Sequence, residues 1–129
     1  MKYVVTKRAK IDGIAVRVNL PYGAKVERVG DYLFKNGYRI CSAKSDTGRA
    51  YFSPDADGNG LKRGELIRTI KETLERRDVD WQKRWDRIWG SLLCKRYQNT
   101  DHLDFWVWNQ QFYEAPIVDL ERILALISA

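Results

Sequence analysis

The stretch DADGNG, residues 55–60, lies where the sequence pattern changes from strands to helices. Before it, short segments rich in β-branched and aromatic residues are separated by turn residues, and after it apolar residues recur with the period of a helix. We expect an α+β fold, in which an N-terminal β-meander or small SH3-like barrel is packed against a C-terminal layer of three to four helices. The chain is long enough for one domain, with residues 1–54 β-rich, 55–60 a polar turn and 61–129 helical.

Six short segments of the first half are expected to be strands: residues 3–9, 13–20, 25–29, 31–37, 38–43 and 49–53. Asn36-Gly37 is the clearest turn between them, because both residues tolerate the positive φ that a type I′ hairpin turn needs. Turns are also expected at Asp12-Gly13 and Asp46-Thr47-Gly48. Segments this short, about ten residues apart, are typical of a meander or small barrel.

Three helices are expected in the second half. The first runs over residues 61–77, and the last begins after Pro116 and places Leu120 and Ile127 on one face. The middle helix carries an apolar stripe of Trp81, Trp85, Ile88, Trp89 and Leu92. Asp78 and Asp80 are candidate N-caps for it. Residues 102–113 fit both a strand and a helix, and we favour the helix.

DADGNG also matches the start of a calcium-binding loop. Such a loop has oxygen ligands at positions 1, 3 and 5, glycine at 6 and a bidentate glutamate at 12. The first four requirements are met by Asp55, Asp57, Asn59 and Gly60. Position 12 is Leu66, so the strongest ligand is missing. We therefore expect no metal but a tight polar turn, with positive φ at Gly58 and Gly60; the alternative makes Asp55, Asp57 and Asn59 metal ligands.

No catalytic motif stands out in this chain, and we expect neither enzymatic activity nor a cofactor. The one histidine, His102, could form a thiol–imidazole pair with Cys41, but no signature surrounds either residue. Acidic residues near the predicted helix starts complement the helix dipole more simply than they hold Mg²⁺. Phosphate-binding glycine loops and zinc-protease motifs do not occur.

The net charge is +6 and is unevenly distributed. Residues 1–60 carry 11 Lys/Arg and 6 Asp/Glu, residues 61–97 again carry 11 and 6, and residues 98–129 carry 1 and 5. A basic body of this kind predicts an acidic partner, either a protein, a ribonucleoprotein or a nucleic acid.

Basic side chains of the first two predicted helices are the candidate partner- or nucleic-acid-binding residues. They are Lys62, Arg63, Arg68, Lys71, Lys83, Arg84 and Arg87. Tryptophans interleaved with cations, as in WQKRWDRIW (81–89), also occur where bases stack, but their helical spacing favours a core stripe with a charged outer face. Carboxylates interrupt the basic residues, which favours a protein target over nucleic acid.

Compartment and processing signals are few. Cys41 and Cys94 have no metal-binding or redox spacing, so we expect free thiols in a reducing cytoplasm. The N-terminal MKYVVTKRAK lacks the apolar centre of a signal peptide, and no apolar run approaches the roughly 20 residues of a membrane span.

Three segments, LPYGAKVE (20–27), DGNGLKRGEL (57–66) and WQKRWDRIW (81–89), carry a resemblance to small accessory proteins of temperate bacteriophages and prophages of Gram-positive bacteria. The resemblance implies a cytoplasmic protein that modulates or inhibits a host protein or ribonucleoprotein, such as a defence component, by stoichiometric binding. The alternative is a nucleic-acid-binding regulator that uses the basic faces of the helices at 61–97.

Overall fold

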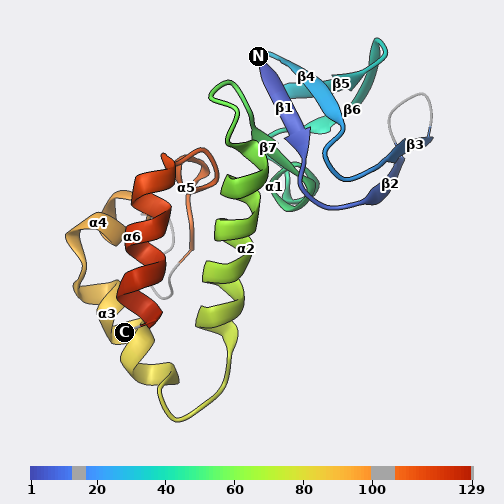
Figure 1. Cartoon of the computed structure of the whole chain (residues 1–129). Coiled ribbons are helices and arrows are strands. Elements are labelled where there is room, and N and C mark those ends of the chain that lie inside the picture. The colour runs from blue at the N-terminus through green and yellow to red at the C-terminus, as the bar shows by residue number, and fades with distance from the viewer. Residues whose placement is uncertain (13–16, 100–106, 129) are drawn as a thin grey trace. The chain divides into compact units, whose positions relative to one another are not determined.

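The computed structural model describes residues 1–12, 17–99 and 107–128, which form two compact units. The sheet unit comprises Met1–Gly64 and the helical unit comprises Glu65–Ala129. Figure 1 shows the strands in the first unit and most of the helical residues in the second, so the predicted α+β class is confirmed. Packing of the sheet against the helical layer, and folding of the two units as one domain, stay predictions.

Seven strands, one short helix and the beginning of a longer helix make up the described part of the sheet unit. The strands are β1 (Lys2–Val5), β2 (Ala9–Asp12), β3 (Arg17–Leu20), β4 (Lys25–Val29), β5 (Tyr32–Lys35), β6 (Tyr38–Ser42) and β7 (Phe52–Pro54). Five of them form an antiparallel sheet in the order β6-β5-β4-β1-β7, while β2 and β3 pair separately. The β4-β5-β6 segment is a meander, as predicted. The barrel alternative is wrong, because the sheet ends at β6 on one side and β7 on the other and does not close.

The hairpin between β5 and β6 confirms the Asn36-Gly37 prediction. Asn36 has φ 52° and Gly37 has φ 82°, and the flanking Lys35 and Tyr38 are directly paired. A register irregularity between Leu33 and Phe34 lets both Leu33 and Ile40 of this hairpin enter the core.

A helix replaces part of a predicted strand. Residues 49–51 belong to α1 (Asp46–Tyr51), and only Phe52–Pro54 are extended, as β7. Ser45 caps α1, since its Oγ accepts a hydrogen bond from the N–H of Gly48 at 3.0 Å. A Cβ on Gly48 would lie 2.2 Å from the carbonyl oxygen of Ser42, so this predicted turn glycine is instead a close-contact glycine inside a helix.

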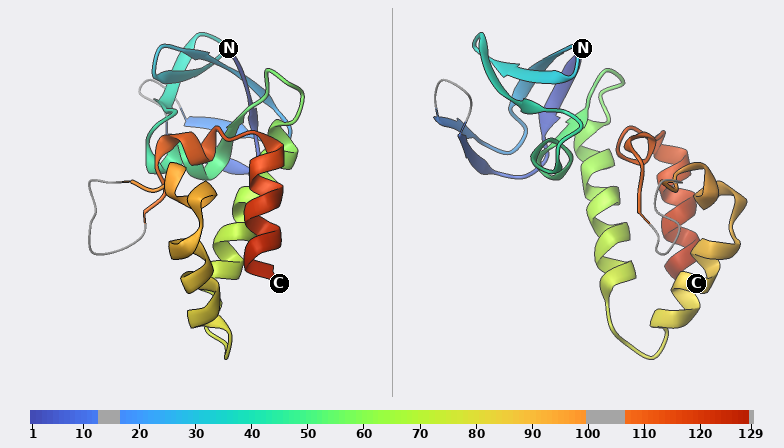
Figure 2. Two further views of the ribbon diagram at one scale, coloured as in Figure 1. Left: turned by 90° about the vertical axis from the view of Figure 1, so that its left-hand side faces the viewer. Right: turned by 180° about the vertical axis from the view of Figure 1, so that it is seen from behind.

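One face of the sheet, whose strands Figure 2 shows in two further views, holds the core of this unit. Val26 and Leu33, at 4% and 0% exposure, alternate with more exposed residues along β4 and β5, and Tyr3 of β1, at 2% exposure, is paired with Val26 on the same face. The buried residues of this core are Tyr3, Val5, Leu20, Val26, Leu33, Ile40, Ala43 and Phe52.

The polar turn leads into α2 (Gly60–Glu75). Gly58 has the predicted positive φ, at 75°, but the prediction for Gly60 is wrong, because Gly60 is the first residue of the helix and its φ is not positive. Its hydrogen side chain serves close packing instead. A Cβ on Gly60 would lie 2.4 Å from Val4 Cγ1, and one on Gly64 would lie 2.4 Å from Thr6 Cγ2. The first turn of α2 therefore lies directly on residues 4–6.

The helical unit contains the rest of α2 and four further helices. These are α3 (Trp81–Gly90), α4 (Leu92–Arg96), α5 (Gln110–Tyr113) and α6 (Ile117–Ser128). The described part of the unit thus has five helices where three to four were predicted, because α4 and α5 are short additions of five and four residues. Ile70, Ile88 and Leu120, from three different helices, are fully buried in one core.

The apolar stripe of α3 is only partly buried. Ile88 is buried and Trp85 packs against the core, but Trp89 is 41% exposed and Leu92 is 83% exposed. Leu92 leaves the stripe because α3 stops at Gly90 and Ser91 caps a new helix, α4. Arg84, predicted to face solvent, is buried at 3% exposure, for reasons given below.

The chain between α4 and α6 combines both patterns expected for it. Trp108 forms an isolated antiparallel bridge with Gln98, while α5 covers residues 110–113. Trp108 stacks on Phe112 with ring centroids 3.9 Å apart. His102 and the rest of residues 100–106 lie outside the described residues. Across the described part of the chain, none of the helices combines the length and apolar content needed to cross a membrane.

Candidate functional site

The polar turn is held together by its own carboxylates. Asp55 Oδ1 accepts from the N–H of Gly60 at 2.8 Å, and its Oδ2 pairs with Lys25 Nζ. Asp57 Oδ1 accepts from the N–H of Asn59 at 3.0 Å, and its Oδ2 pairs with Arg63 Nη2 at 2.8 Å. These bonds tie the turn both to β4 and to the first turn of α2.

The two acidic residues of the turn are stabilised in their charged forms. The hydrogen bond from Lys25 lowers the pKa of Asp55, and that from Arg63 lowers the pKa of Asp57. Calcium could bind the alternative ligands Asp55, Asp57 and Asn59 only by displacing both cations. In the described ranges, no group of three or more His, Cys, Asp or Glu side chains is placed to hold a metal ion.

The candidate basic residues of 61–97 do not form one surface. Arg63 and Arg84 are buried at 4% and 3% exposure, and both are bonded to aspartates. Arg63 also donates to the carbonyl oxygen of Pro54, at 2.5 Å. Lys71 is half-buried over the ring of Tyr113, 4.9 Å from its centroid. The remaining residues keep more exposure: Lys62, Arg68 and Lys83 are exposed, and Arg87 is half-buried.

Charge divides sharply between the two units. The sheet unit, residues 1–64, carries 13 Lys/Arg and 6 Asp/Glu, a net charge of +7. The helical unit, residues 65–129, carries 10 Lys/Arg and 11 Asp/Glu, a net charge of −1. The excess of positive charge therefore lies in the sheet unit, because in the helical unit the acidic residues of 98–129 offset the basic residues of 65–97.

Basic and aromatic side chains share the face of the sheet opposite its core. Directly paired residues of antiparallel strands point to the same face, so Lys2, Glu27, Phe34 and Arg39 form one row across β1, β4, β5 and β6. Tyr32, two residues before Phe34, points the same way, and the guanidinium of Arg39 lies 4.6 Å from its ring centroid. We call this surface the basic–aromatic face: Lys2, Lys25, Glu27, Tyr32, Phe34, Lys35 and Arg39.

A hollow of about 160 Å³ lies in this face. Lys2, Lys25, Lys35 and Phe34 are among its lining residues. Its one carboxylate is Glu27, which pairs with the N-terminal ammonium at 2.7 Å. The hydrogen bond from that ammonium lowers the pKa of Glu27 and keeps it charged. The hollow thus has three lysines around the ring of Phe34, and the charge of its one carboxylate is balanced by the N-terminal ammonium. This arrangement favours an anionic ligand that has flat, apolar parts.

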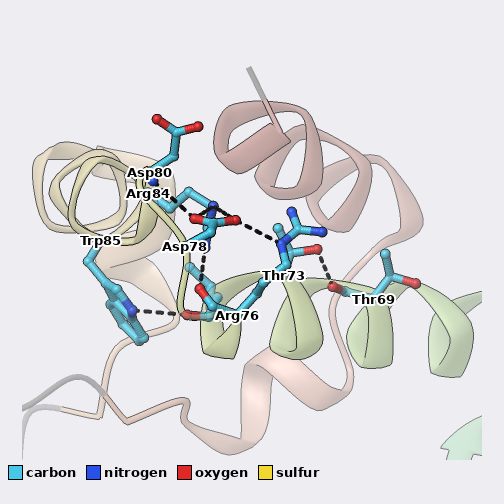
Figure 3. Close-up of polar contacts among 8 residues, drawn as sticks. Thr69, Thr73, Arg76, Asp78, Asp80, Arg84 and Trp85 are labelled. Atoms are coloured by element: carbon cyan, nitrogen blue, oxygen red, sulfur yellow. Dashed lines mark hydrogen bonds and ion pairs between the residues drawn. The ribbon is translucent and has the colours of Figure 1, made fainter.

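The helical unit has a separate arginine pocket of about 390 Å³ (Figure 3). Arg76, Arg84 and Arg87 line it together with Asp78 and Asp80. Arg84 Nη1 donates to both oxygens of Asp78, at 2.9 and 3.2 Å, and its Nη2 donates to the carbonyl oxygen of Arg76. Burial raises the pKa of Asp78, but the bonds from Arg84 and from the N–H of Asp80 outweigh it, and the pKa is lowered overall.

These contacts also explain why α2 ends where it does. The last carbonyl groups of a helix lack partners within the helix. Arg84 bonds the carbonyl oxygen of Arg76, and Trp85 Nε1 bonds that of Leu74 at 3.1 Å. Of the two predicted N-caps of α3, Asp80 occupies the N-cap position, but its side chain makes no capping hydrogen bond. Asp78 does not cap the helix, and its carboxylate accepts from Arg84.

Two thiols and one phenol among the described residues have raised pKa values. Cys41 and Cys94 are free thiols, and burial raises the pKa of each. Burial, together with a hydrogen bond to Asp119, raises the pKa of Tyr97 to about 12. Thiols and a phenol of this kind are poorly ionised near neutral pH, which does not suit them to nucleophilic or acid–base chemistry.

Comparisons with known proteins found no match. No family model matches the chain, and no curated protein or solved structure matches it. The origin from a temperate phage stays a prediction.

Sequence reasoning missed the basic–aromatic face. One indication of this face in the sequence is the positive charge of the first half, since residues 1–60 alone carry 11 Lys/Arg and 6 Asp/Glu. The strand pattern in DYLFKNGYRI also contains it, because Tyr32 and Phe34 alternate with the buried Leu33. Alternation alone could not show which strands are neighbours, and the row from Lys2 to Arg39 depends on that order.

Proposed function

We propose that this chain is a non-enzymatic binding protein whose sheet unit binds single-stranded nucleic acid on the basic–aromatic face. The observation that carries the proposal is the separation of charge, +7 on the sheet unit against −1 on the helical unit. Cations bind phosphates through counterion release, and exposed aromatic rings stack with bases.

Internal ion pairing does not remove this excess charge. Six carboxylates can neutralise at most six of the 13 cations in the sheet unit. Several of these pairs are visible, including Lys25 with Asp55 and Lys44 with Asp31 at 3.3 Å. The sheet unit therefore keeps a net charge of +7, and a polyanion is the ligand that gains most from such a concentration of charge.

Exposed aromatic rings favour a single strand over a duplex. Tyr32 and Tyr38 are 42% and 48% exposed, and Phe34 is half-buried beside the lysines of the hollow. A ring on an open sheet can stack on an unpaired base, whereas base pairing and stacking hide the base faces of a duplex. Backbone phosphates can then reach Lys2, Lys35 and Arg39.

A second candidate function is favoured by exposed apolar side chains of the helical unit. Trp89, Leu92 and Val118 are 41%, 83% and 51% exposed, on a unit with nearly no net charge. Such residues suit a protein partner better than a nucleic acid. In this candidate the chain is a phage-encoded modulator or inhibitor of a host protein or ribonucleoprotein, as the sequence resemblance implies.

Fluorescence anisotropy distinguishes the two candidates. Labelled single-stranded oligonucleotides of DNA and RNA are titrated with the full chain, beside a duplex of the same sequence. We expect tighter binding to a single strand, with log affinity falling against log salt at about −0.7 per phosphate neutralised. Phe34→Ala is expected to weaken that binding by about 1 to 3 kcal/mol, the stacking energy of one base.

Failure of every oligonucleotide to bind would overturn the nucleic-acid proposal. The protein candidate is then tested by capture from a nuclease-treated host lysate, with Leu92→Asp as the comparison. Retention of one stoichiometric partner by the parent chain but not by Leu92→Asp supports the second candidate, and retention of no partner contradicts it.

A further inference from the structure

The arginine pocket of the helical unit contains a buried donor without an acceptor. Arg84 is 3% exposed and lines the pocket, and its Nη groups are bonded to Asp78 and to the carbonyl oxygen of Arg76. Its Nε–H, also buried, has no hydrogen-bond partner among the described residues. A buried donor of a charged group is costly to leave unpaired, so the site gains from a ligand that supplies an oxygen.

The charges around this donor favour an oxyanion over a cation. Arg76, Arg84 and Arg87 face two carboxylates, those of Asp78 and Asp80. Asp78 is already bonded by Arg84 and by Arg76 Nε at 3.1 Å, while Asp80 lies 3.9 Å from Lys83 Nζ. The lining holds three arginines and two aspartates, which is a formal excess of one positive charge.

The opposite wall supplies acceptors and apolar contact. Thr69 Oγ1 donates to the carbonyl oxygen of Glu65 at 2.9 Å, and Thr73 Oγ1 donates to that of Thr69 at 2.7 Å. Both hydroxyl hydrogens are thus used, and the oxygens can accept hydrogen bonds from a ligand. Leu124, Ile127 and Ser128 complete the lining. The volume, about 390 Å³, lies at the lower end of the range for small-molecule sites.

We propose that this pocket binds a small phosphate monoester that carries hydroxyl groups. A phosphate oxygen accepts from Arg84 Nε, Arg87 and Arg76 balance the remaining charge, and hydroxyls of the organic part donate to Thr69 and Thr73. The site is independent of the basic–aromatic face and belongs to the other unit.

Nuclear magnetic resonance tests the proposal on the full chain with three probes: glycerol 3-phosphate, inorganic phosphate and glycerol, each at constant ionic strength adjusted with chloride. We expect the Arg84 Hε resonance to shift saturably with glycerol 3-phosphate, less tightly with inorganic phosphate, and not with glycerol. Arg87→Gln is expected to weaken the phosphate binding by about tenfold, as for one lost charge-assisted hydrogen bond.

The matched control is Lys95→Gln, an exposed cation of α4 that does not line the pocket, and it is expected to leave the affinity unchanged. Arg84→Lys keeps the charge but lacks Nε; if it remains folded, it is expected to lose binding. Absence of a saturable Arg84 Hε shift, or equal weakening by Arg87→Gln and Lys95→Gln, would overturn the proposal. Neither result would bear on nucleic-acid binding by the sheet unit.

Discussion

The guanidinium of Arg84 donates to both carboxylate oxygens of Asp78, at 2.9 and 3.2 Å, while Arg84 itself is 3% exposed. This pair joins α3 to the loop between α2 and α3, and removal of Asp78 would leave a buried cation without its anion. We therefore expect Asp78→Ala to destabilise the protein, because the buried Arg84 would lose its anionic partner.

Chemical denaturation of a double-mutant cycle measures this pair. Arg84→Met and Asp78→Ala together are expected to cost less than the sum of the single changes, with a coupling of about 1 to 3 kcal/mol. The control is Arg76→Ala, because Arg76 bonds the same carboxylate from a side chain that is 63% exposed, and we expect it to cost below about 1 kcal/mol. Additive costs for Arg84→Met and Asp78→Ala would show that the pair is not coupled.

The ion pair of Asp57 with Arg63 predicts that the free energy of unfolding depends on pH. The pKa of Asp57 is lowered in the folded protein, so its contribution is fully present above the unfolded value near 3.8 and is lost as pH falls below it. The stability difference between the parent chain and Asp57→Asn is expected to be about 0.5 to 1 kcal/mol near neutral pH, because the Asp57 side chain is 49% exposed and solvent screens the pair, and to shrink below about pH 4. Urea unfolding at a series of pH values measures it, and a difference that does not change with pH would contradict the pairing.

Calorimetry with calcium provides a separate check of the polar turn. Since Lys25 and Arg63 already occupy the carboxylates of Asp55 and Asp57, we expect no saturable heat from calcium. Micromolar affinity that disappears when both aspartates become asparagine would make Asp55, Asp57 and Asn59 metal ligands after all.

Close packing of α1 makes Gly48 intolerant of a side chain. A Cβ there would lie 2.2 Å from Ser42 O and 2.9 Å from backbone atoms of Ala43, which cannot move aside as a flexible side chain could. We expect Gly48→Ala to destabilise by about 1 to 3 kcal/mol or more. The matched control is Gly90→Ala in α3, which would meet no atom within 4 Å and is expected to be neutral or stabilising by up to about 1 kcal/mol. Thermal unfolding of both variants decides it, and equal melting temperatures would contradict this packing.

Local chemistry explains which parts of the fold were predictable. The turn at Asn36-Gly37 depends on a φ requirement that these residues satisfy by themselves, so the sequence predicts it. The α2 and α6 helices follow from apolar periodicity. Helix α1 was missed because GRAYFS has strand-like residues, and its helical form depends on the cap by Ser45 and on the close approach of Gly48 to Ser42.

Tertiary partners explain what the sequence could not show. Arg84 stands among charged residues of α3, and only its acceptors, Asp78 and the carbonyl oxygen of Arg76, account for its burial. The difference in net charge between the two units could not be predicted either, because it depends on where one unit ends and the next begins. The boundary between the units falls between Gly64 and Glu65, inside one continuous helix, so no break in the sequence marks it.

Trp85 combines packing with a hydrogen bond and was predicted to be core. It is half-buried, and its Nε1 caps the carbonyl oxygen of Leu74. We expect Trp85→Ala to cost about 2 kcal/mol, less than the about 3 to 5 kcal/mol of a fully buried indole, and Trp85→Phe to cost about 1 kcal/mol. Trp89→Ala, at a site 41% exposed, should cost less than either. Chemical denaturation ranks the three, and a larger loss for Trp89→Ala would contradict the described packing of α3.

Charge reversal on one unit at a time tests the central claim most directly. Lys35→Glu with Arg39→Glu changes the basic–aromatic face, and Lys83→Glu with Lys95→Glu changes exposed cations of the helical unit, so both variants have the same net charge. For a labelled single-stranded oligonucleotide, we expect the first variant to bind at least about tenfold more weakly and to flatten the salt slope by about 1.4, the effect of two phosphate contacts. The second variant is expected to bind like the parent chain. Equal weakening by both variants, or weakening by the helical variant alone, would contradict binding by the sheet unit.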